Sequence, residues 1–383
     1  MDAINFEPFQ LPPEAETLRL EVREFLRETL DAYPPRKRAE SWTGSSPEFS
    51  RKLGERGWIG MTWPKQYGGH ERTAFDRYVV CEELLAAGAP VGFHWIADRQ
   101  SGPLLLRFGT HAQRERLLPR IAAGEICFGI GMSEPGSGSD LASLRTRATK
   151  CDGGWTINGR KVWTTLGHEA QYLIALVRTA PQDPKHRHDG LTQFIIDMTT
   201  PGITVSPVVN MIGEHHFNEI VFDDVLVPDD AVVGGEGEGW KQVTAELAYE
   251  RSGPERYLSS HLMLNELVRQ LEGSDDPRAH VEVGRLVARL ATLRRMSVSV
   301  AGMLEGGASP ALEGAVVKSL GVSLEQDLPV LAEDLTGLEP SVDTGSDFQQ
   351  VLGYLSQAAV SFSLRGGTPE IMRGIIARGL SLR

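Results

Sequence analysis

Cysteines and long apolar runs are scarce in this sequence. Its 383 residues include only Cys81, Cys127 and Cys151, an odd and scattered set that predicts small core residues in a reducing compartment rather than a disulfide framework. No apolar run approaches the roughly 20 residues that span a bilayer. The acidic N-terminal stretch lacks the charged and apolar regions of a secretory signal. Together these absences predict a cytoplasmic protein without a membrane span.

Concentrated positive charge and clusters of metal ligands are also lacking. The formal net charge is −12, and Lys and Arg are scattered, whereas a nucleic-acid partner requires a concentrated basic surface. An anionic ligand would need local Arg, Lys or helix N-termini, because the overall field would not attract it. His186 with His188, and His215 with His216, have no partner ligands at metal-binding spacing. We therefore expect neither nucleic acid nor a metal ion.

The spacing of apolar residues predicts helices in the first and last thirds of the chain. A chain of this length suits two or three domains. Gly and Pro separate the helices of residues 1–125, and the long helices of residues 236–383 suggest a bundle. The expected helices cover Glu14–Ala32, Pro47–Arg56, Ala74–Ala86, Gly92–Phe108, Ala112–Ala123, Trp240–Leu271, Val281–Leu304, Ala311–Leu335 and Phe348–Leu364.

The middle of the chain, residues 126–235, consists of short β-rich segments separated by turn residues. Asn158-Gly159 between β-rich flanks predicts a hairpin turn. Short strands at near-regular spacing predict a small antiparallel barrel or sandwich. The domains are therefore expected at 1–125, 126–235 and 236–383. The expected strands cover Thr146–Thr149, Gly154–Ile157, Lys161–Thr165, Tyr172–Val177, Thr192–Asp197 and Glu219–Val225.

Two stretches of the β region have the residue types of a binding site. The first, Ser133–Asp140 (SEPGSGSD), follows an apolar run. Its glycines let the backbone approach a ligand and its serines offer uncharged donors, although a flexible turn explains the composition equally well. In the second, Trp163 and Thr165 share one face of an expected strand. They either pack within the barrel or bind a flat heterocycle, with the indole as an aromatic wall and the hydroxyl as a hydrogen-bonding group.

A third stretch, Arg365–Arg373 (RGGTPEIMR), predicts the start of a helix. Thr368 is the expected N-cap, Pro369 the first helical residue, and Glu370 lies in the first turn. Such a helix start can be an ordinary cap, or its free amides can hold a phosphate or ribose oxygen.

In order, spacing and position these stretches resemble the acyl-CoA dehydrogenase family. Members carry a TEPG-x-GSD-like loop, then an NG-x-K-x-W-x-T segment, then a GGT-x-E-I-x-R end. Glu219–Pro228 also resembles the barrel-closing strand of that family. The resemblance covers nearly the whole chain. It implies an α+β multi-domain fold with an N-terminal helical domain, a central antiparallel β-barrel and a C-terminal four-helix bundle.

The resemblance also implies a cofactor, FAD, between the β domain and the bundle. Ser139 would additionally touch the pantetheine arm of an acyl-CoA substrate. The matched cofactor contacts are backbone and hydroxyl groups of Met132, Ser133 and Ser139 along the flavin, Trp163 and Thr165 beside its ring, and Thr368 and Glu370 at the adenosine-diphosphate half.

The reaction that the resemblance implies is α,β-desaturation of an acyl-CoA thioester. A carboxylate would remove the α-proton while the β-hydride passes to flavin N5. The thioester oxygen would accept hydrogen bonds from the flavin ribityl chain and from a backbone N–H as enolate charge develops. An electron-transfer flavoprotein would then receive the electrons.

The sequence departs from the commonest family pattern at the catalytic base. Many members place a Glu immediately before the Gly-Thr of the last motif, where this chain has Gly366, which keeps only a backbone N–H for the thioester oxygen. A minority carry the base on the first helix of the bundle, in a Leu-x-x-Glu-Arg-like context that Leu247–Arg251 matches. We therefore predict Glu250 as the base and Arg251 as a substrate contact. An ordinary helix ion pair is the alternative for Glu250.

Two more departures bear on assembly. Leu271–Arg278 replaces the Arg-x-x-Phe-Gly segment that usually reaches the FAD of a neighbouring subunit, and the Gly-rich flavin loop is weak at Leu335–Pro340. The chain is thus expected in a homo- or hetero-oligomer, a dimer or tetramer, and could be the catalytic half of a mixed pair. A partner-dependent subunit and a flavin oxidase or monooxygenase on the same fold are the alternatives.

Overall fold

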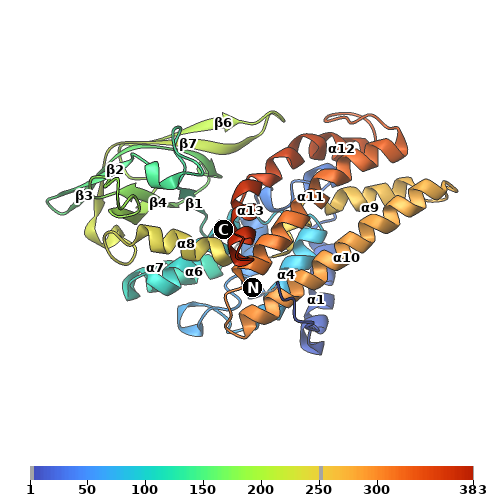
Figure 1. Cartoon of the computed structure of the whole chain (residues 1–383), viewed down its shortest axis with the longest axis horizontal. Coiled ribbons are helices and arrows are strands. Elements are labelled where there is room, and N and C mark those ends of the chain that lie inside the picture. Colours follow the sequence, from blue (N-terminus) through green and yellow to red (C-terminus); the bar gives the residue numbers. More distant parts are fainter. Residues whose placement is uncertain (1–3, 250–252, 383) are drawn as a thin grey trace. The chain divides into compact units, whose positions relative to one another are not determined.

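The computed structural model describes residues 4–249 and 253–382, which belong to two compact units. The helical unit combines Met1–Gly44, Arg72–Val91 and Ala248–Arg383, and the sheet unit combines Ser45–Glu71 and Gly92–Leu247 (Figure 1). Each unit therefore joins segments that are far apart in the sequence. The three-domain boundaries expected at residues 125 and 235 stay a prediction.

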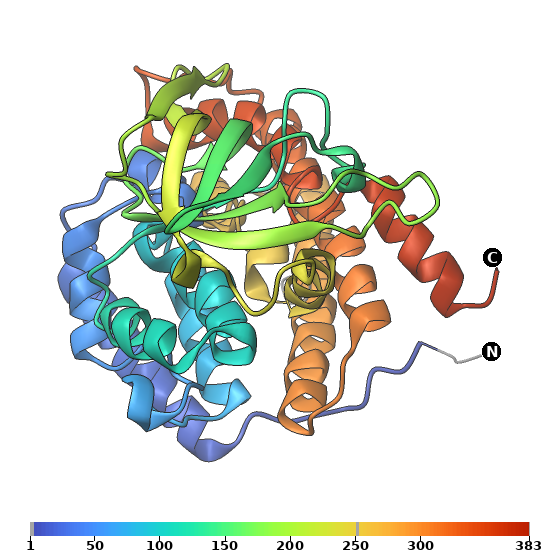
Figure 2. The ribbon, with the colours of Figure 1, turned by 90° about the vertical axis from the view of Figure 1, so that its left-hand side faces the viewer.

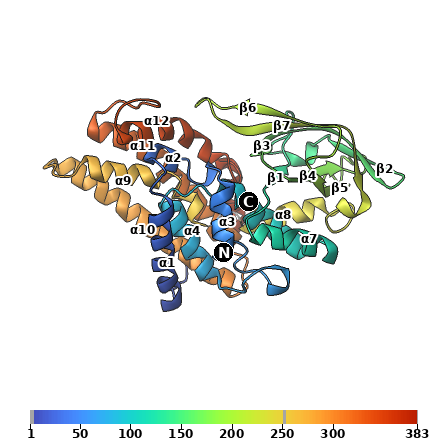
Figure 3. The same ribbon diagram turned by 180° about the vertical axis from the view of Figure 1, so that it is seen from behind.

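In the helical unit, α1 packs against α4, α4 against α10, and α11 against α10 and α13 (Figures 1 and 3). An ion network around the buried Glu82 links α1, α4 and α10, since Arg19 of α1 and Arg294 of α10 both bond Glu82 of α4 at 2.7 Å. The elements are α1 Pro13–Thr29, α2 Pro35–Arg38, η1 Ser41–Thr43, α4 Ala74–Ala86, η6 Pro254–Arg256, α9 His261–Gln270, α10 Pro277–Glu305, α11 Ala311–Thr336, α12 Asp347–Ala358, η7 Ala359–Ser363 and α13 Pro369–Gly379.

Several helices begin at caps that the local sequence supplies. Before α4, Thr73 Oγ1 accepts a bond from the Asp76 amide (3.0 Å), and the Asp76 carboxylate accepts one from the Thr73 amide (3.3 Å). Thr110 and Gln113 form the same reciprocal pair before α7. These bonds satisfy amides that have no partner within the helix, so the helices begin where the sequence predicts.

The single helix predicted over Trp240–Leu271 is wrong. α8 covers Gly239–Tyr249, and α9 begins only at His261, with Gly253-Pro254 in the segment between them. Proline lacks the N–H of a helical residue and glycine has a low helix propensity. The apolar period therefore continues across a break in the helix.

The sheet unit holds a curled sheet with helices beside it (Figures 1 and 2). Its helices are α3 Pro47–Glu55, η2 Lys65–Tyr67, α5 Gly92–Ile96, η3 Ala97–Ser101, α6 Gly102–Phe108, α7 His111–Ala122, η4 Leu141–Ser143, η5 Asp229–Ala231 and α8 Gly239–Tyr249. Its strands are β1 Phe128–Gly131, β2 Arg147–Cys151, β3 Gly154–Thr165, β4 Tyr172–Arg178, β5 Leu191–Asp197, β6 Ile203–Val209 and β7 His215–Pro228.

The strand order is β1-β4-β2-β3-β7-β6, and β5 pairs with β4. The predicted fold class is confirmed, with one difference in the sheet: β1 and β2 run parallel to β4, whereas the other pairs are antiparallel. Buried side chains such as Ile157, Phe194 and Phe222 form the core of the sheet. β6 was not among the predicted strands.

The hairpin turn predicted at Asn158-Gly159 is wrong. These residues lie inside β3, and the turn between β2 and β3 falls at Asp152-Gly153. Gly159 has φ +142°, and a Cβ there would lie 2.6 Å from Thr146 Oγ1. The glycine is therefore needed where the backbone is irregular and where the residue before β2 approaches β3 closely. It does not form a turn.

Candidate functional site

The SEPGSGSD stretch is a tight loop that follows β1 in the sheet unit. The Glu134 amide donates to the Ser137 carbonyl at 2.8 Å, and the Ser137 amide donates back at 3.0 Å. A Cβ added at Gly136 or Gly138 would meet no atom within 4 Å. The protein's own packing therefore does not require these glycines, and the backbone is left open to an approaching group.

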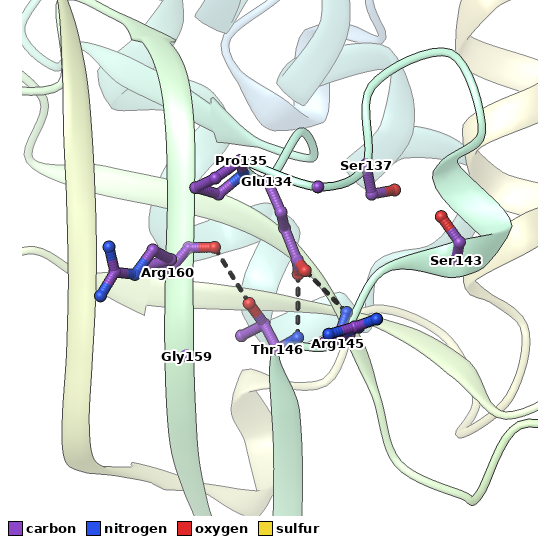
Figure 4. A pocket seen from close by; sticks show the side chains of 9 residues that line it. Glu134, Pro135, Ser137, Ser143, Arg145, Thr146, Gly159 and Arg160 are labelled. Atoms are coloured by element: carbon purple, nitrogen blue, oxygen red, sulfur yellow. Dashed lines mark hydrogen bonds between the residues drawn. The ribbon is translucent and has the colours of Figure 1, made fainter.

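Glu134 points from this loop back into the protein (Figure 4). Its carboxylate accepts bonds from the amides of Arg145 (2.6 Å) and Thr146 (2.9 Å) and from Lys161 Nζ (2.8 Å). Lys161 is completely buried and also donates to the Met132 carbonyl at 3.1 Å. Burial lowers the pKa of Lys161 to about 8, despite the opposing effect of Glu134.

The neighbouring strand β3 carries Trp163, the residue expected to form an aromatic wall beside the loop. The Val162 amide donates to the Ser133 carbonyl at 2.9 Å, which fixes the loop beside the next residue, Trp163. Trp163 is 59% exposed, has φ +64°, and lies where the pairing of β3 with β7 is irregular. Its indole meets Phe217 edge-on at 5.8 Å, and Thr165 pairs with Phe217 in the register. An exposed indole thus lies on the strand that is bonded to the open loop.

A pocket of about 440 Å³ lies behind the loop (Figure 4). Thr146 bridges its floor by donating from Oγ1 to the Arg160 carbonyl at 3.2 Å. The lining residues are Glu134, Pro135, Gly136, Ser137, Ser143, Arg145, Thr146, Gly159 and Arg160.

Five of the predicted cofactor contacts therefore come from one unit. Met132 and Ser133 are half-buried at the start of the loop, and Ser139 is exposed near its end. Trp163 and Thr165 follow on the strand that the loop is bonded to. The open glycine backbone, the hydroxyl groups and the exposed indole fit a flat heterocycle with polar edges, as a flavin has.

The remaining described candidates lie in the helical unit. Gly366 (φ +65°) and Gly367 (φ +104°) form a left-handed turn before α13. A Cβ on Gly366 would lie 2.9 Å from Arg256 Nη2, and buried Lys318 donates to the Gly367 carbonyl. The backbone conformation at position 366 therefore favours glycine, and any side chain there would require the Arg256 guanidinium to shift.

Thr368 occupies the predicted N-cap of α13, followed by Pro369 at the first helical position and Glu370 in the first turn. Bonds from its own backbone amide and from Thr368 lower the pKa of the exposed Glu370 carboxyl. Glu250 and Arg251 lie outside the described residues, directly after α8.

Lys161 and Glu134 were not among the predicted site residues, although the sequence contains a signal for Lys161. In β3 the inward positions alternate from Trp155 through Ile157, so Lys161 falls on the buried face. A buried lysine needs a counter-charge.

Among the described residues, no group of three or more His, Cys, Asp or Glu side chains could hold a metal ion. No helix in this part of the chain combines the length and apolar character of a membrane span.

Comparisons with known proteins agree on one family. Residues 12–125 match the model of the acyl-CoA dehydrogenase N-terminal domain, and residues 129–225 match that of the middle domain. The acyl-CoA dehydrogenase FadE34 of Mycobacterium tuberculosis is 35% identical over 87% of this chain. The chain spans about half of that relative, 46% of its length.

Two solved structures are similar over almost the whole chain. The structure titled Tcur3481-Tcur3483 steroid ACAD has a TM-score of 0.87 at 28% identity and covers 97% of this chain and 98% of its own. The ChsE4-ChsE5 complex from Mycobacterium tuberculosis has a TM-score of 0.85 at 30% identity, over 98% and 99%. The chain belongs to the acyl-CoA dehydrogenase family, oxidoreductases that act on a CH–CH group.

Proposed function

We propose that this chain catalyses FAD-dependent α,β-desaturation of an acyl-CoA thioester, with Glu250 as the base that removes the α-proton. The observation that carries this proposal is the arrangement of loop and strand: an open glycine backbone bonded beside the exposed indole of Trp163. When bound, FAD would supply the acceptor for the β-hydride.

The chain's own groups would then bind and orient both ligands. The main chain of Met132 and Ser133 would line the flavin, and Trp163 and Thr165 would border its ring. Thr368 and Glu370 would contact its adenosine-diphosphate half, and Ser139 the pantetheine arm of the substrate.

The turn before α13 supports a base located elsewhere in the chain. Gly366 has no side chain that could remove a proton, and its left-handed conformation favours glycine at this position. Its N–H would donate to the thioester oxygen, where charge develops as the α-proton leaves. Glu250, which follows α8 in the family-like Leu-x-x-Glu-Arg context, would supply the missing carboxylate, and Arg251 would contact the substrate.

The relatives support a bulky substrate and a mixed assembly. One similar structure is titled a steroid acyl-CoA dehydrogenase and another a complex of two named proteins. The missing neighbour-reaching segment at Leu271–Arg278 agrees with a two-chain enzyme. We therefore propose a ring-bearing acyl-CoA as substrate, a hetero-oligomer containing this chain, and an electron-transfer flavoprotein as electron acceptor.

The proposal is tested by purifying the chain alone and counting bound FAD per chain from flavin absorbance. Anaerobic additions of acyl-CoAs from short to steroid-like should then bleach the flavin, most strongly with the bulky esters. Less than half a flavin per chain would exclude a self-sufficient homomer. No bleaching by any ester, even after a partner chain is added, would exclude the desaturation itself. Rapid oxygen consumption would point to an oxidase instead.

A further inference from the structure

A buried ion pair connects the glycine–serine loop to the strand that carries Trp163. Lys161 lies on the inward face of β3, and a Cβ on Gly131 of β1 would lie 3.2 Å from its Cγ. Its Nζ donates to the Met132 carbonyl at 3.1 Å and to Glu134 Oε1 at 2.8 Å. One ammonium group thus binds both the backbone and the side chain of the loop.

Glu134 extends this connection to the start of β2. Its two oxygens accept bonds from the amides of Arg145 (2.6 Å) and Thr146 (2.9 Å) (Figure 4). Thr146 is buried, so its amide would lose its acceptor if the carboxylate moved. The single carboxylate therefore joins the end of β1, the start of β2 and the middle of β3.

The connection also determines where the loop backbone lies relative to the indole. The Ser133 carbonyl accepts a hydrogen bond from the Val162 amide at 2.9 Å. Val162 lies between Lys161, which bonds the loop, and Trp163, which carries the indole. Met132 and Ser133 cannot shift along β3 without breaking bonds to Lys161 and Val162. The loop and the wall are thus held as one rigid element.

Net stability is a weak reason for such a pair. A buried ion pair commonly stabilises a fold no more than apolar residues of the same volume, because desolvation offsets the Coulomb attraction. Its directional hydrogen bonds, by contrast, hold atoms in one geometry. The distribution of bonds over three segments therefore matches a positioning role.

We infer that Glu134 and Lys161 are positioning residues that hold the main chain of Met132 and Ser133 at a fixed place beside Trp163, ready for the flavin. This inference rests on the proposed function for the identity of the ligand. The placement of the loop itself rests only on the hydrogen bonds above.

The test compares Lys161→Met and the double variant Glu134→Gln/Lys161→Met with the wild-type chain. The double variant leaves no unpaired charge and keeps an acceptor for the buried amide, so it should fold. The matched control is Val227→Ala, which opens the sheet core in β7, where Val227 pairs with Trp155 of β3. Flavin-free protein of each is titrated with FAD, and amide hydrogen exchange is followed over residues 132–146 and at Val162.

Lys161→Met and the double variant, called the clamp variants, should both bind FAD at least tenfold more weakly. The visible spectrum of their bound flavin should be shifted, and the amides of the loop and of Val162 should exchange faster. Val227→Ala should lower the melting temperature yet keep the wild-type affinity, spectrum and loop protection. Wild-type affinity together with wild-type exchange in both clamp variants would overturn the inference.

The test separates this inference from the proposed function. If the wild-type chain bound no FAD with or without a partner chain, the proposed function would fail, and exchange in the flavin-free protein would still decide whether the pair holds the loop. Faster exchange in the clamp variants would then support the placement, and unchanged exchange would overturn it.

Discussion

Replacing Gly366 by Ala should damage both the fold and the proposed reaction. The residue has φ +65°, a conformation that costs an ordinary L-residue about 1–2 kcal/mol. The new methyl group would lie 2.9 Å from Arg256 Nη2, so the buried guanidinium must also shift. For a unit of this size the backbone cost alone corresponds to a melting temperature about 2–8 °C lower.

The effect on activity should be larger than the effect on stability. If the turn relaxes, the Gly366 N–H would no longer reach the thioester oxygen in the proposed arrangement, and loss of one such donor lowers kcat by about 10²- to 10³-fold. Gly374→Ala is the matched control, because this glycine lies within α13 and a Cβ there has no neighbour nearer than 3.9 Å. That variant should be up to about 1 kcal/mol more stable, with unchanged kcat.

The assay combines thermal unfolding with steady-state desaturation of the best acyl-CoA. A Gly366→Ala protein with wild-type kcat and melting temperature would refute the reasoning about this turn. A protein that unfolds earlier but keeps its kcat would refute only the role of the N–H.

Three other perturbations have defined outcomes. Glu250→Gln should retain FAD but lose bleaching by substrate in anaerobic mixing, because the side chain keeps its shape and loses its basicity; bleaching at the wild-type rate would exclude Glu250 as the base. Gly136→Ala should leave the unfolding midpoint of the flavin-free protein unchanged or slightly higher, since its Cβ enters open space, yet weaken FAD binding in titration; equal affinity would mean that the ligand does not approach this residue. His94 is buried beside Ser50 Oγ (2.8 Å), and burial lowers its pKa to about 4. Its unfolded state therefore binds more protons below about pH 6.5, so stability should fall by up to about 3 kcal/mol as the pH drops from 6.5 towards 4. Denaturation midpoints at pH 7 and pH 4.5 check this, and His94→Gln should flatten the dependence.

The sequence allowed the element types to be predicted because periodicity and caps are local. The helix expected at Ala74–Ala86 has those bounds in the structure, where Thr73 and Asp76 cap it. Strands such as β4 were recognised from continuous apolar runs that are buried on both faces. The break after α8 was missed, since the apolar spacing continues across it.

The rest depends on contacts between residues that are distant in the sequence. Asn158-Gly159 has the local signature of a turn, but its glycine is required by Thr146, the residue just before the neighbouring strand β2. Glu134 and Lys161 are 27 positions apart, and no local pattern pairs them. The guanidinium that a side chain at position 366 would displace likewise belongs to Arg256, more than a hundred residues earlier.

Removal of the α-proton and the β-hydride of an acyl-CoA is the reaction that we propose for this chain. The most direct measurement is anaerobic turnover of the purified chain, alone and with a partner subunit, using ferricenium as electron acceptor and mass spectrometry of the CoA ester. We expect a 2-enoyl-CoA that has lost two hydrogens, formed in step with acceptor reduction. Unchanged ester despite bound FAD would contradict it.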